Sequence, residues 1–369
     1  MKIGILTLPL RTNYGGILQA YAMQTILKRM GHETYVMVES EKSKVRWFLN
    51  KMDSILIKYK DNIVISSFIK KFRKTLFLEI NSRSFIKKYI HTKCVDFSLN
   101  RSNTLKLDAI VVGSDQVWRP KYVQGRGVSM MFLDFAANWD IQRLSYAASL
   151  GTDVWEYTPL EEEVCYHLIK NFKAISVREQ SSVKLLKMHF GVDVSFVLDP
   201  TMLLEPDDYL SLCHGYGNHK GNLLCYVIDH SEQSAEMIKI ARETLQMVPF
   251  VVNSKYEDFS ANYWERKQPP VENWITGFAE AQMVITDSFH ACVFSILFNK
   301  PFWVVENKKR GIARIKNLLE TFSLGNRILS ADSLHITDWH QSIDWKSVNY
   351  RRESLKQDSF HYLQNNLTN

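Results

Sequence analysis

Short apolar runs alternate with amphipathic stretches along most of the first half of the chain. Runs of this length predict buried strands, whereas apolar residues at every third or fourth position predict helices. The predicted strands cover residues 2–8, 34–38, 108–112, 143–149, 174–177 and 194–198. Amphipathic stretches at 17–27, 160–172 and 180–190 predict helices between them. Strands separated by helices form parallel sheets, so the first half predicts an α/β domain.

The same alternation starts again after a polar stretch with several glycines at 205–221, where we place the domain junction. The second set of predicted strands covers 223–228, 249–253, 283–286 and 302–305. The predicted helices cover 231–245, 271–279, 288–298 and 314–322, and the polar tail at 348–367 predicts one more. We therefore expect two α/β domains that face each other across a cleft, at 1–204 and 205–345.

Residues 41–93 interrupt this alternation with a basic, aromatic-containing segment. It has fourteen Lys/Arg against four Asp/Glu, so its charge of +10 exceeds the chain's net +7 and leaves the rest near −3. The pattern predicts an insert of one to three amphipathic helices. Three interpretations remain open: helices lying on an anionic membrane surface, a nucleic-acid surface, or an insert with a solvated basic face. No nucleic-acid-binding motif is present, so we expect no nucleic-acid partner.

Composition and cysteine usage exclude several classes of protein. No apolar run reaches the ~18 residues of a membrane-spanning helix, and Arg11, Asn13 and two glycines interrupt the first apolar run where a signal peptide stays apolar. The five cysteines are odd in number and form no C-x-x-C pair. That argues against a disulfide framework and a zinc site, so we expect no metal and a cytoplasmic location.

The most specific candidate site follows the predicted strand at 283–286. Asp287 and Ser288 are both good helix N-cap residues, and the first turn of the next helix would direct free N–H groups and a positive dipole end toward a ligand. Such a site suits a phosphate. His290 falls in this turn, where it could donate a proton or a hydrogen bond. The alternative is that Ser288 only caps the helix and His290 only packs.

Asn13, Tyr14, Gly15 and Gly16 follow the first predicted strand. Glycine lets a backbone approach a ligand closely, so this loop is a candidate acceptor site. It lacks the G-x-G-x-x-G spacing of dinucleotide-binding loops, so no dinucleotide is indicated. A simple tight turn explains the pattern equally well.

Asp115 and Trp118 follow the predicted strand at 108–112. Asp115 could act as a base or bind a sugar hydroxyl, and Trp118 could stack on a sugar face. The alternative makes Asp115 a helix cap and Trp118 a core residue.

Three arginines are candidates for binding an anionic donor. Arg178 leaves its strand at the predicted ligand edge, and a guanidinium pairs with carboxylate or phosphate through two hydrogen bonds. The alternative for Arg178 is a surface ion pair with Glu179. Arg310 and Arg314 follow the strand at 302–305 and could reach the anion site of His290, or lie on a solvated helix face.

Six segments together resemble the polysaccharide pyruvyltransferase family. They are IGILT at 3–7, NYGGILQA at 13–20, VGSDQVW at 112–118, SYAAS at 145–149, SVRE at 176–179 and TDSFH at 286–290. The resemblance implies a GT-B-like fold of two Rossmann-like domains, with the acceptor on the first, the donor on the second, and the helix at 346–369 returning to the first. It implies His290 as general acid and Arg178 as a ligand of the donor.

The family resemblance also implies the reaction. Pyruvate would pass from phosphoenolpyruvate, a co-substrate, to a sugar of a bacterial surface polysaccharide or its precursor, often as a cyclic ketal, with no resident cofactor. A lipid-linked acceptor would explain a basic segment near the inner face of the membrane. Family members often have arginine at the position of Ser288, so here the anion would depend on the helix N-terminus, the serine hydroxyl, and Arg314 or Arg310.

Two other functions remain open on this sequence. The same two-domain cleft suits a glycosyltransferase that uses a nucleotide sugar, and Ser288 in place of arginine leaves room for one. The chain could also be a non-catalytic partner in a glycan-assembly complex. Such a partner would keep the fold but bind no donor.

Overall fold

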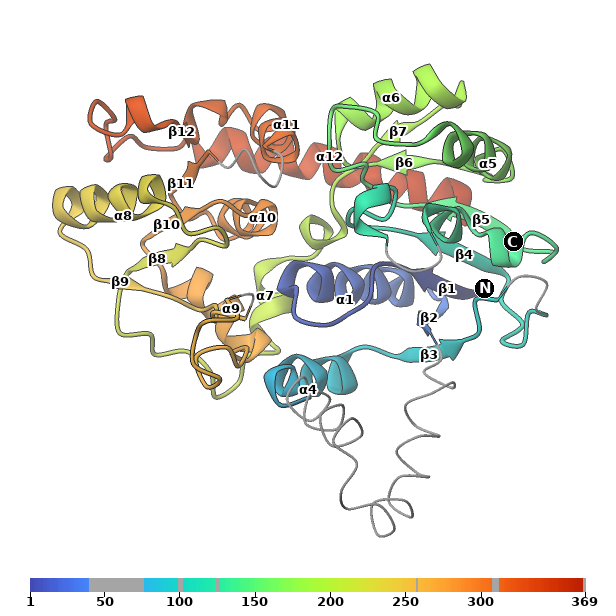
Figure 1. Ribbon diagram of the computed structural model, residues 1–369, viewed down its shortest axis with the longest axis horizontal. Coiled ribbons are helices and arrows are strands. Elements are labelled where there is room, and N and C mark those ends of the chain that lie inside the picture. Colours follow the sequence, from blue (N-terminus) through green and yellow to red (C-terminus); the bar gives the residue numbers. More distant parts are fainter. Residues whose placement is uncertain (40–75, 99–101, 124–126, 257, 307–311, 368–369) are drawn as a thin grey trace, which may run out of the picture.

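The computed structural model describes residues 1–39, 76–98, 102–123, 127–256, 258–306 and 312–367. It contains two α/β domains side by side, each built on a parallel five-stranded sheet, and a long C-terminal helix that runs from one to the other (Figure 1). The expected α/β fold of two Rossmann-like domains is confirmed.

The first sheet has the order β3-β2-β1-β4-β5, and every pair is parallel. Its strands are β1 (Lys2–Leu6), β2 (Glu33–Glu39), β3 (Thr92–Val95), β4 (Ala109–Val112) and β5 (Gln142–Ser145). A parallel pair, β6 (Ser176–Val177) and β7 (Ser195–Phe196), continues beyond β5 through isolated bridges. All four residues of β4 are buried, as expected for a central strand covered on both faces.

Helices cover this sheet and follow its strands. They are α1 (Tyr14–Arg29), α4 (Ile80–Tyr89), α5 (Pro159–Ile169) and α6 (Gln180–Phe190). Short 3-10 turns at Val128–Phe132 and Asp134–Ala136 add aromatic side chains to the core between β4 and β5.

The second sheet has the order β12-β11-β10-β8-β9 and is also parallel. Its strands are β8 (Leu223–Tyr226), β9 (Pro249–Phe250), β10 (Met283–Thr286), β11 (Phe302–Val305) and β12 (Ile328–Leu329). The main helices are α8 (Glu232–Leu245), α9 (Val271–Glu280), α10 (Phe289–Leu297) and α11 (Ala313–Thr321). All nine residues of α10 are buried, so this apolar helix is part of the core.

The structure corrects the extent of the predicted helical insert at 41–93. Residues 40–75 lie outside the described part. Of the remainder, Ile80–Tyr89 is helical, but Thr92–Val95 is strand β3 at the edge of the first sheet, where Val38 pairs with Cys94. The insert therefore ends before β3.

The predicted junction at 205–221 contains a short helix, α7 (Pro206–Leu210). The last helix, α12 (Trp345–Asn366), then runs back against the first domain. There the Tyr362 hydroxyl donates to the backbone oxygen of Ser145 (2.8 Å), and the Leu198 N–H donates to the Ser359 hydroxyl (3.0 Å).

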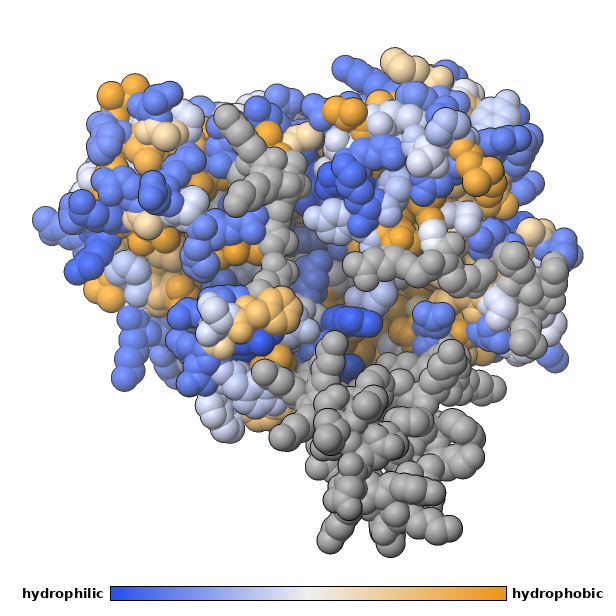
Figure 2. Space-filling model, viewed as in Figure 1, coloured by the Kyte–Doolittle hydropathy of each residue, from blue (hydrophilic) through white to orange (hydrophobic). Residues whose placement is uncertain are grey.

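A continuous apolar core joins the two domains. On the face shown in Figure 2, hydrophilic side chains cover most of both domains and the apolar ones are scattered among them. None of the helices in the described part of the chain combines the length and hydropathy needed to cross a membrane.

Candidate active site between the two domains

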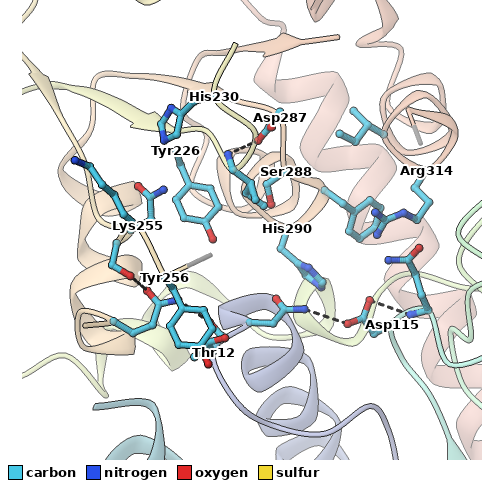
Figure 3. Close-up of a pocket in the computed structure, with 18 of the residues that line it drawn as sticks. Thr12, Asp115, Tyr226, His230, Lys255, Tyr256, Asp287, Ser288, His290 and Arg314 are labelled. Carbon is cyan, nitrogen blue, oxygen red and sulfur yellow. Dashed lines mark hydrogen bonds between the residues drawn. The ribbon is translucent and has the colours of Figure 1, made fainter. Parts of the chain in front are cut away.

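A cavity of about 390 Å³ lies between the domains, at the carboxyl ends of strands from both sheets (Figure 3). Parallel sheets bind ligands at this edge, because the loops that leave it converge there. The first domain contributes Thr12, Asn13, Asp115, Gln116 and Tyr122. The second contributes Tyr226, Ile228, His230, Asn253, Ser254, Lys255, Tyr256, Asp258, Gln268, Asp287, Ser288, Phe289, His290, Arg314 and Ile315.

Helix α10 begins at the wall of this cavity with Ser288 as its N-cap. The Ser288 side chain makes no cap hydrogen bond, and its backbone N–H donates to the Thr286 hydroxyl (3.0 Å). Asp287 does not cap the helix as predicted. Its carboxylate instead accepts hydrogen bonds from the backbone N–H groups of Ile228 (2.8 Å) and Asp229 (2.9 Å). Asp287 therefore holds the loop after β8 beside the loop after β10, and its negative charge makes it unsuited to binding an anionic donor.

His290 lies in the first turn of α10 and is only 6% exposed. Within the part of the chain that the structure describes, its Nε2 has no hydrogen-bond partner, and it lies 3.8 Å from Oδ2 of Asp199. Burial, together with the positive charges of Arg178 and Arg314, lowers the pKa of His290 to about 4, although Asp199 and Asp115 act in the opposite direction. The imidazole is therefore neutral at pH 7 in the unliganded protein.

The loop at 13–16 contributes to the site differently from the prediction. A Cβ placed on Gly15 would lie 2.0 Å from Nδ1 of His290, so Gly15 makes room for the histidine and not for a ligand. Tyr14 is buried between the domains, where its hydroxyl donates to the backbone oxygen of Pro269 (2.9 Å). The Gly16 N–H donates to the Asn13 side chain (3.2 Å). Only Asn13 of the four lines the cavity.

Arg178 does not reach the cavity, which corrects its predicted role as a ligand of the donor. Its guanidinium is buried and pairs with Asp199 (2.6 Å), Asp115 (3.2 Å) and Glu179 (3.2 Å). It also stacks on the ring of Phe289, 4.3 Å from the centroid. Burial alone would lower the pKa of Arg178, but the three carboxylates outweigh burial and raise it. Sequence alone could not show that three carboxylates surround this arginine.

The carboxylate of Asp115 lines the cavity but already accepts hydrogen bonds from groups of the protein. It accepts hydrogen bonds from Arg178 (3.2 Å), from the Asn13 side chain (3.3 Å) and from the Gln116 N–H (2.9 Å). Its φ of 71° is in the left-handed region, which aspartate tolerates better than most residues. Burial acts to raise its pKa, but Arg178, with His290 and Arg314, holds it below the usual value. Asp115 is therefore ionised and a weak base, suited to orienting a hydroxyl.

Arg314 supplies the cation that the sequence placed near His290. It lines the cavity from α11, half-buried, with its guanidinium 5.7 Å from the Phe289 ring centroid. Its Nε has no hydrogen-bond partner, and within the described ranges Arg314 forms no ion pair. Burial and the nearby charge of Arg178 lower its pKa. An anion in the cavity could therefore bind the Arg314 guanidinium without displacing a carboxylate of the protein. Arg310 lies outside the described residues.

Trp118 is a core residue, which corrects its predicted contact with a sugar. The indole is fully buried, stacks on Phe132 (4.9 Å between centroids, 15° between planes), and donates from Nε1 to the backbone oxygen of Met131 (3.1 Å). The 3-10 turns after β4 supply both partners, and the sequence pattern did not reveal these turns.

Several residues of the cavity were missed in the sequence. Tyr226 and His230 lie at the exit of β8, and Lys255 and Tyr256 lie after β9 (Figure 3). Asn253 also follows β9 and lines the cavity. Both strands were predicted, and the rule that ligands bind beyond strand ends applies to their exits too. No group of three or more His, Cys, Asp or Glu in the described parts of the chain could hold a metal ion.

One solved structure, compared over nearly its whole length, agrees with this architecture. A putative UDP-N-acetylglucosamine 2-epimerase from Listeria monocytogenes is 11% identical, with 98% of each chain covered and a TM-score of 0.50. The UDP-GlcNAc 2-epimerase from Methanocaldococcus jannaschii is 11% identical, with 98% of this chain and 100% of that chain covered and a TM-score of 0.49. Acinetobacter baumannii MurG is 12% identical, with 99% of each chain covered and a TM-score of 0.47. At such identities the likeness concerns the fold alone, which is of the GT-B type.

The comparison with curated proteins finds no match. A family model described as polysaccharide pyruvyl transferase matches residues 13–309, which include α1, the loop after β4, and the start of α10 with Ser288 and His290. This match covers most of the chain and confirms the family resemblance, and five of the six sequence segments lie within it. The chain therefore belongs to the polysaccharide pyruvyl transferase family.

Proposed function

We propose that this protein transfers the pyruvyl group of phosphoenolpyruvate to a sugar of a surface polysaccharide or its precursor. The observation that carries the proposal is the meeting of three groups at one cavity: the N-terminus of α10 at Ser288, the imidazole of His290, and the guanidinium of Arg314. The free N–H groups of a helix N-terminus and an arginine without a carboxylate partner both favour an anion. Phosphoenolpyruvate is an anion that must also be protonated to react.

Each of these groups has a role in one step of the proposed reaction. A proton added to the vinyl carbon of the donor produces an oxocarbenium-like centre at the neighbouring carbon. One sugar hydroxyl forms a C–O bond there and passes its proton to the phosphate group; a second hydroxyl then forms another C–O bond and loses its proton to water, as the C–O bond to phosphate breaks and phosphate leaves. His290 would supply the first proton. The phosphate would bind Arg314, the Ser288 hydroxyl and the first N–H groups of α10.

The acceptor would lie on the other side of the cavity. Asp115 and Gln116 belong to the first domain and line the cavity with polar atoms; Asp115 is labelled in Figure 3. An ionised Asp115 would accept a hydrogen bond from an acceptor hydroxyl and orient it toward the donor carbon. The cavity of about 390 Å³ is within the ~300–1,000 Å³ that is usual for small-molecule sites.

Calorimetric titration of phosphoenolpyruvate tests the donor. We expect binding to the wild type, weaker binding to Ser288→Ala, and no transfer by His290→Ala, with the exposed His361→Ala on α12 as a control that changes neither. A wild type that binds no phosphoenolpyruvate would overturn the proposal. A His290→Ala variant with normal turnover would exclude His290 as the acid.

A nucleotide sugar is the second candidate donor. It is favoured by serine at position 288 and by the extension of the cavity to the aromatic rings of Tyr226 and Tyr256. UDP-N-acetylglucosamine titrated in parallel separates the two, because only a true ligand stabilises the fold by mass action. Binding of this nucleotide sugar in place of phosphoenolpyruvate would identify a glycosyltransferase, and binding of neither would favour a non-catalytic partner.

We also propose that the acceptor is lipid-linked and that the reaction takes place at the inner face of the membrane. The support is the charge of the segment 41–75, which has ten Lys/Arg against three Asp/Glu. Deleting 41–75 spares α4 and β3, so the first sheet keeps its edge strand. We expect the deletion to abolish flotation with vesicles of phosphatidylglycerol; unchanged flotation would contradict membrane contact.

A further inference from the structure

His290 belongs to the second domain, but the carboxylates beside it belong to the first. Asp199 follows β7, and its Oδ2 lies 3.8 Å from Nε2 of the histidine. Asp115 follows β4 and Arg178 directly follows β6, and both act on the imidazole through their charges. Arg314 of α11 also acts on the imidazole through its charge. Nε2 is enclosed and has no hydrogen-bond partner among the described residues.

The charged groups around the neutral imidazole have a net negative charge, which disfavours an anionic ligand. Arg178 and Arg314 contribute two positive charges, while Asp115, Glu179 and Asp199 contribute three negative ones. With a neutral imidazole this cluster of described residues therefore has a net charge of −1. An anion that binds beside it makes the cavity still more negative. A proton on His290 offsets that added charge, so binding the anion and protonating the histidine favour each other.

Asp199 has the geometry to hold the protonated ring. Four donors fix its carboxylate: Arg178 (2.6 Å) and the Ser114 hydroxyl (3.0 Å) at Oδ2, and the N–H (3.0 Å) and hydroxyl (2.6 Å) of Thr201 at Oδ1. An oxygen fixed in this way faces Nε2, and a shift of about 1 Å brings the pair within the ~2.7–3.2 Å of a hydrogen bond. Nδ1 lies on the side of the ring that faces Gly15.

We propose that Asp199 is a positioning residue that lets His290 take up a proton when the anionic donor binds. In the bound state Nε2–H donates to Oδ2 of Asp199, and the imidazolium supplies the proton that is transferred to the donor. This inference rests on the proposed function, because it takes the ligand to be phosphoenolpyruvate. A carboxylate that binds one ring nitrogen fixes the orientation of the ring and leaves the other nitrogen for chemistry.

Proton uptake on binding tests this directly. Phosphoenolpyruvate is titrated at pH 7 in two buffers of different ionisation enthalpy, which gives the number of protons taken up per ligand bound. We expect the wild type to take up close to one proton more than His290→Gln, since protonation of the ligand itself is common to both. Asp199→Asn should bind phosphoenolpyruvate without taking up the extra proton. As the pH rises, its turnover rate should fall at a lower pH than that of the wild type.

The outcomes separate this inference from the proposed function. Suppose that phosphoenolpyruvate binds but that wild type and His290→Gln take up the same number of protons. This result overturns the role of Asp199 and leaves phosphoenolpyruvate as the donor. A wild type that binds no phosphoenolpyruvate overturns both.

Asp199 is buried, so a second measurement avoids any dependence on the folding of Asp199→Asn. NMR of the His290 ring in the wild type reports the protonation of the imidazole. Its titration midpoint must rise from about 4 without ligand to above 7 with phosphoenolpyruvate, and an unchanged midpoint rejects the proposal.

Discussion

Gly15 of the first domain and His290 of the second are in direct contact at the cavity. A Cβ on Gly15 would lie 2.0 Å from Nδ1 and 2.2 Å from Cγ of the imidazole, distances that real atoms do not adopt. The backbone of α1 therefore forms one wall of the space that holds the histidine. Since each residue belongs to a different domain, the position of the histidine depends on how the two domains are packed.

Gly15→Ala is expected to displace His290 or separate the domains and so to lower turnover. A misplacement of ~1 Å at a reacting group can cost about 100-fold in rate, and we expect a loss of at least that size. The matched control is Gly16→Ala in the same turn, whose Cβ would lie 3.3 Å from the Asn13 side chain, which can move. Steady-state kinetics of both variants decide the matter, and a fully active Gly15→Ala would show that the contact is not needed.

The sequence predicted most of the fold because buried parallel strands are short apolar runs with helices between them. Strands β4 and β10 were placed to within one residue. Strand β12 has only two residues, too few to form a pattern, and β3 lies within a basic segment with three of its four residues exposed. Neither strand differs enough from a loop to be recognised from its own residues.

The site was predicted where its chemistry is local and missed where it depends on distant partners. Ser288 and His290 follow a strand directly, so one helix start places both at the cavity. Arg178 has the same kind of position, but its partners Asp115 and Asp199 lie 63 and 21 residues away and occupy its guanidinium. The importance of Asp199 likewise depends on a histidine from the other domain.

Arg178 and Arg314 should respond to mutation in opposite ways. Arg178→Met leaves three buried carboxylates without their cation, and breaking a buried ion pair costs about 3–5 kcal/mol. Arg314→Met removes a cation that is repelled by Arg178, so we expect less than about 1 kcal/mol of lost stability. Losing a hydrogen bond from a charged group should weaken phosphoenolpyruvate binding about 10-fold or more in Arg314→Met.

Urea unfolding and calorimetry of the two arginine variants check both effects. Arg178→Lys is a useful third variant, because it keeps the charge but cannot reach three carboxylates with the same planar group. An Arg178→Met protein as stable as the wild type would contradict the buried cluster. If both Met variants bind phosphoenolpyruvate equally weakly, Arg178 contacts the donor as the sequence predicted.

Trp118 should matter for stability and not for the acceptor. The indole is fully buried against Phe132, and replacing such a tryptophan by alanine costs about 3–5 kcal/mol. Trp264, which is 69% exposed, is the matched control and should change stability by less than about 0.5 kcal/mol. If Trp118→Ala instead keeps its stability and raises the KM for a sugar acceptor, the ring contacts the sugar after all.

The buried neutral His290 predicts how stability depends on pH. Its pKa is about 4 in the folded protein and about 6.5 when unfolded, so between these values the unfolded chain binds the extra proton. Its contribution is therefore fully present above pH 6.5 and is lost as the pH falls toward 4. The difference corresponds to roughly 3 kcal/mol. His290→Gln lacks the titrating group, so its stability should fall less over this window. Urea unfolding of both proteins at pH 7, 5.5 and 4.5 measures the difference, and parallel curves would show that the pKa of His290 is the same in the folded and the unfolded protein.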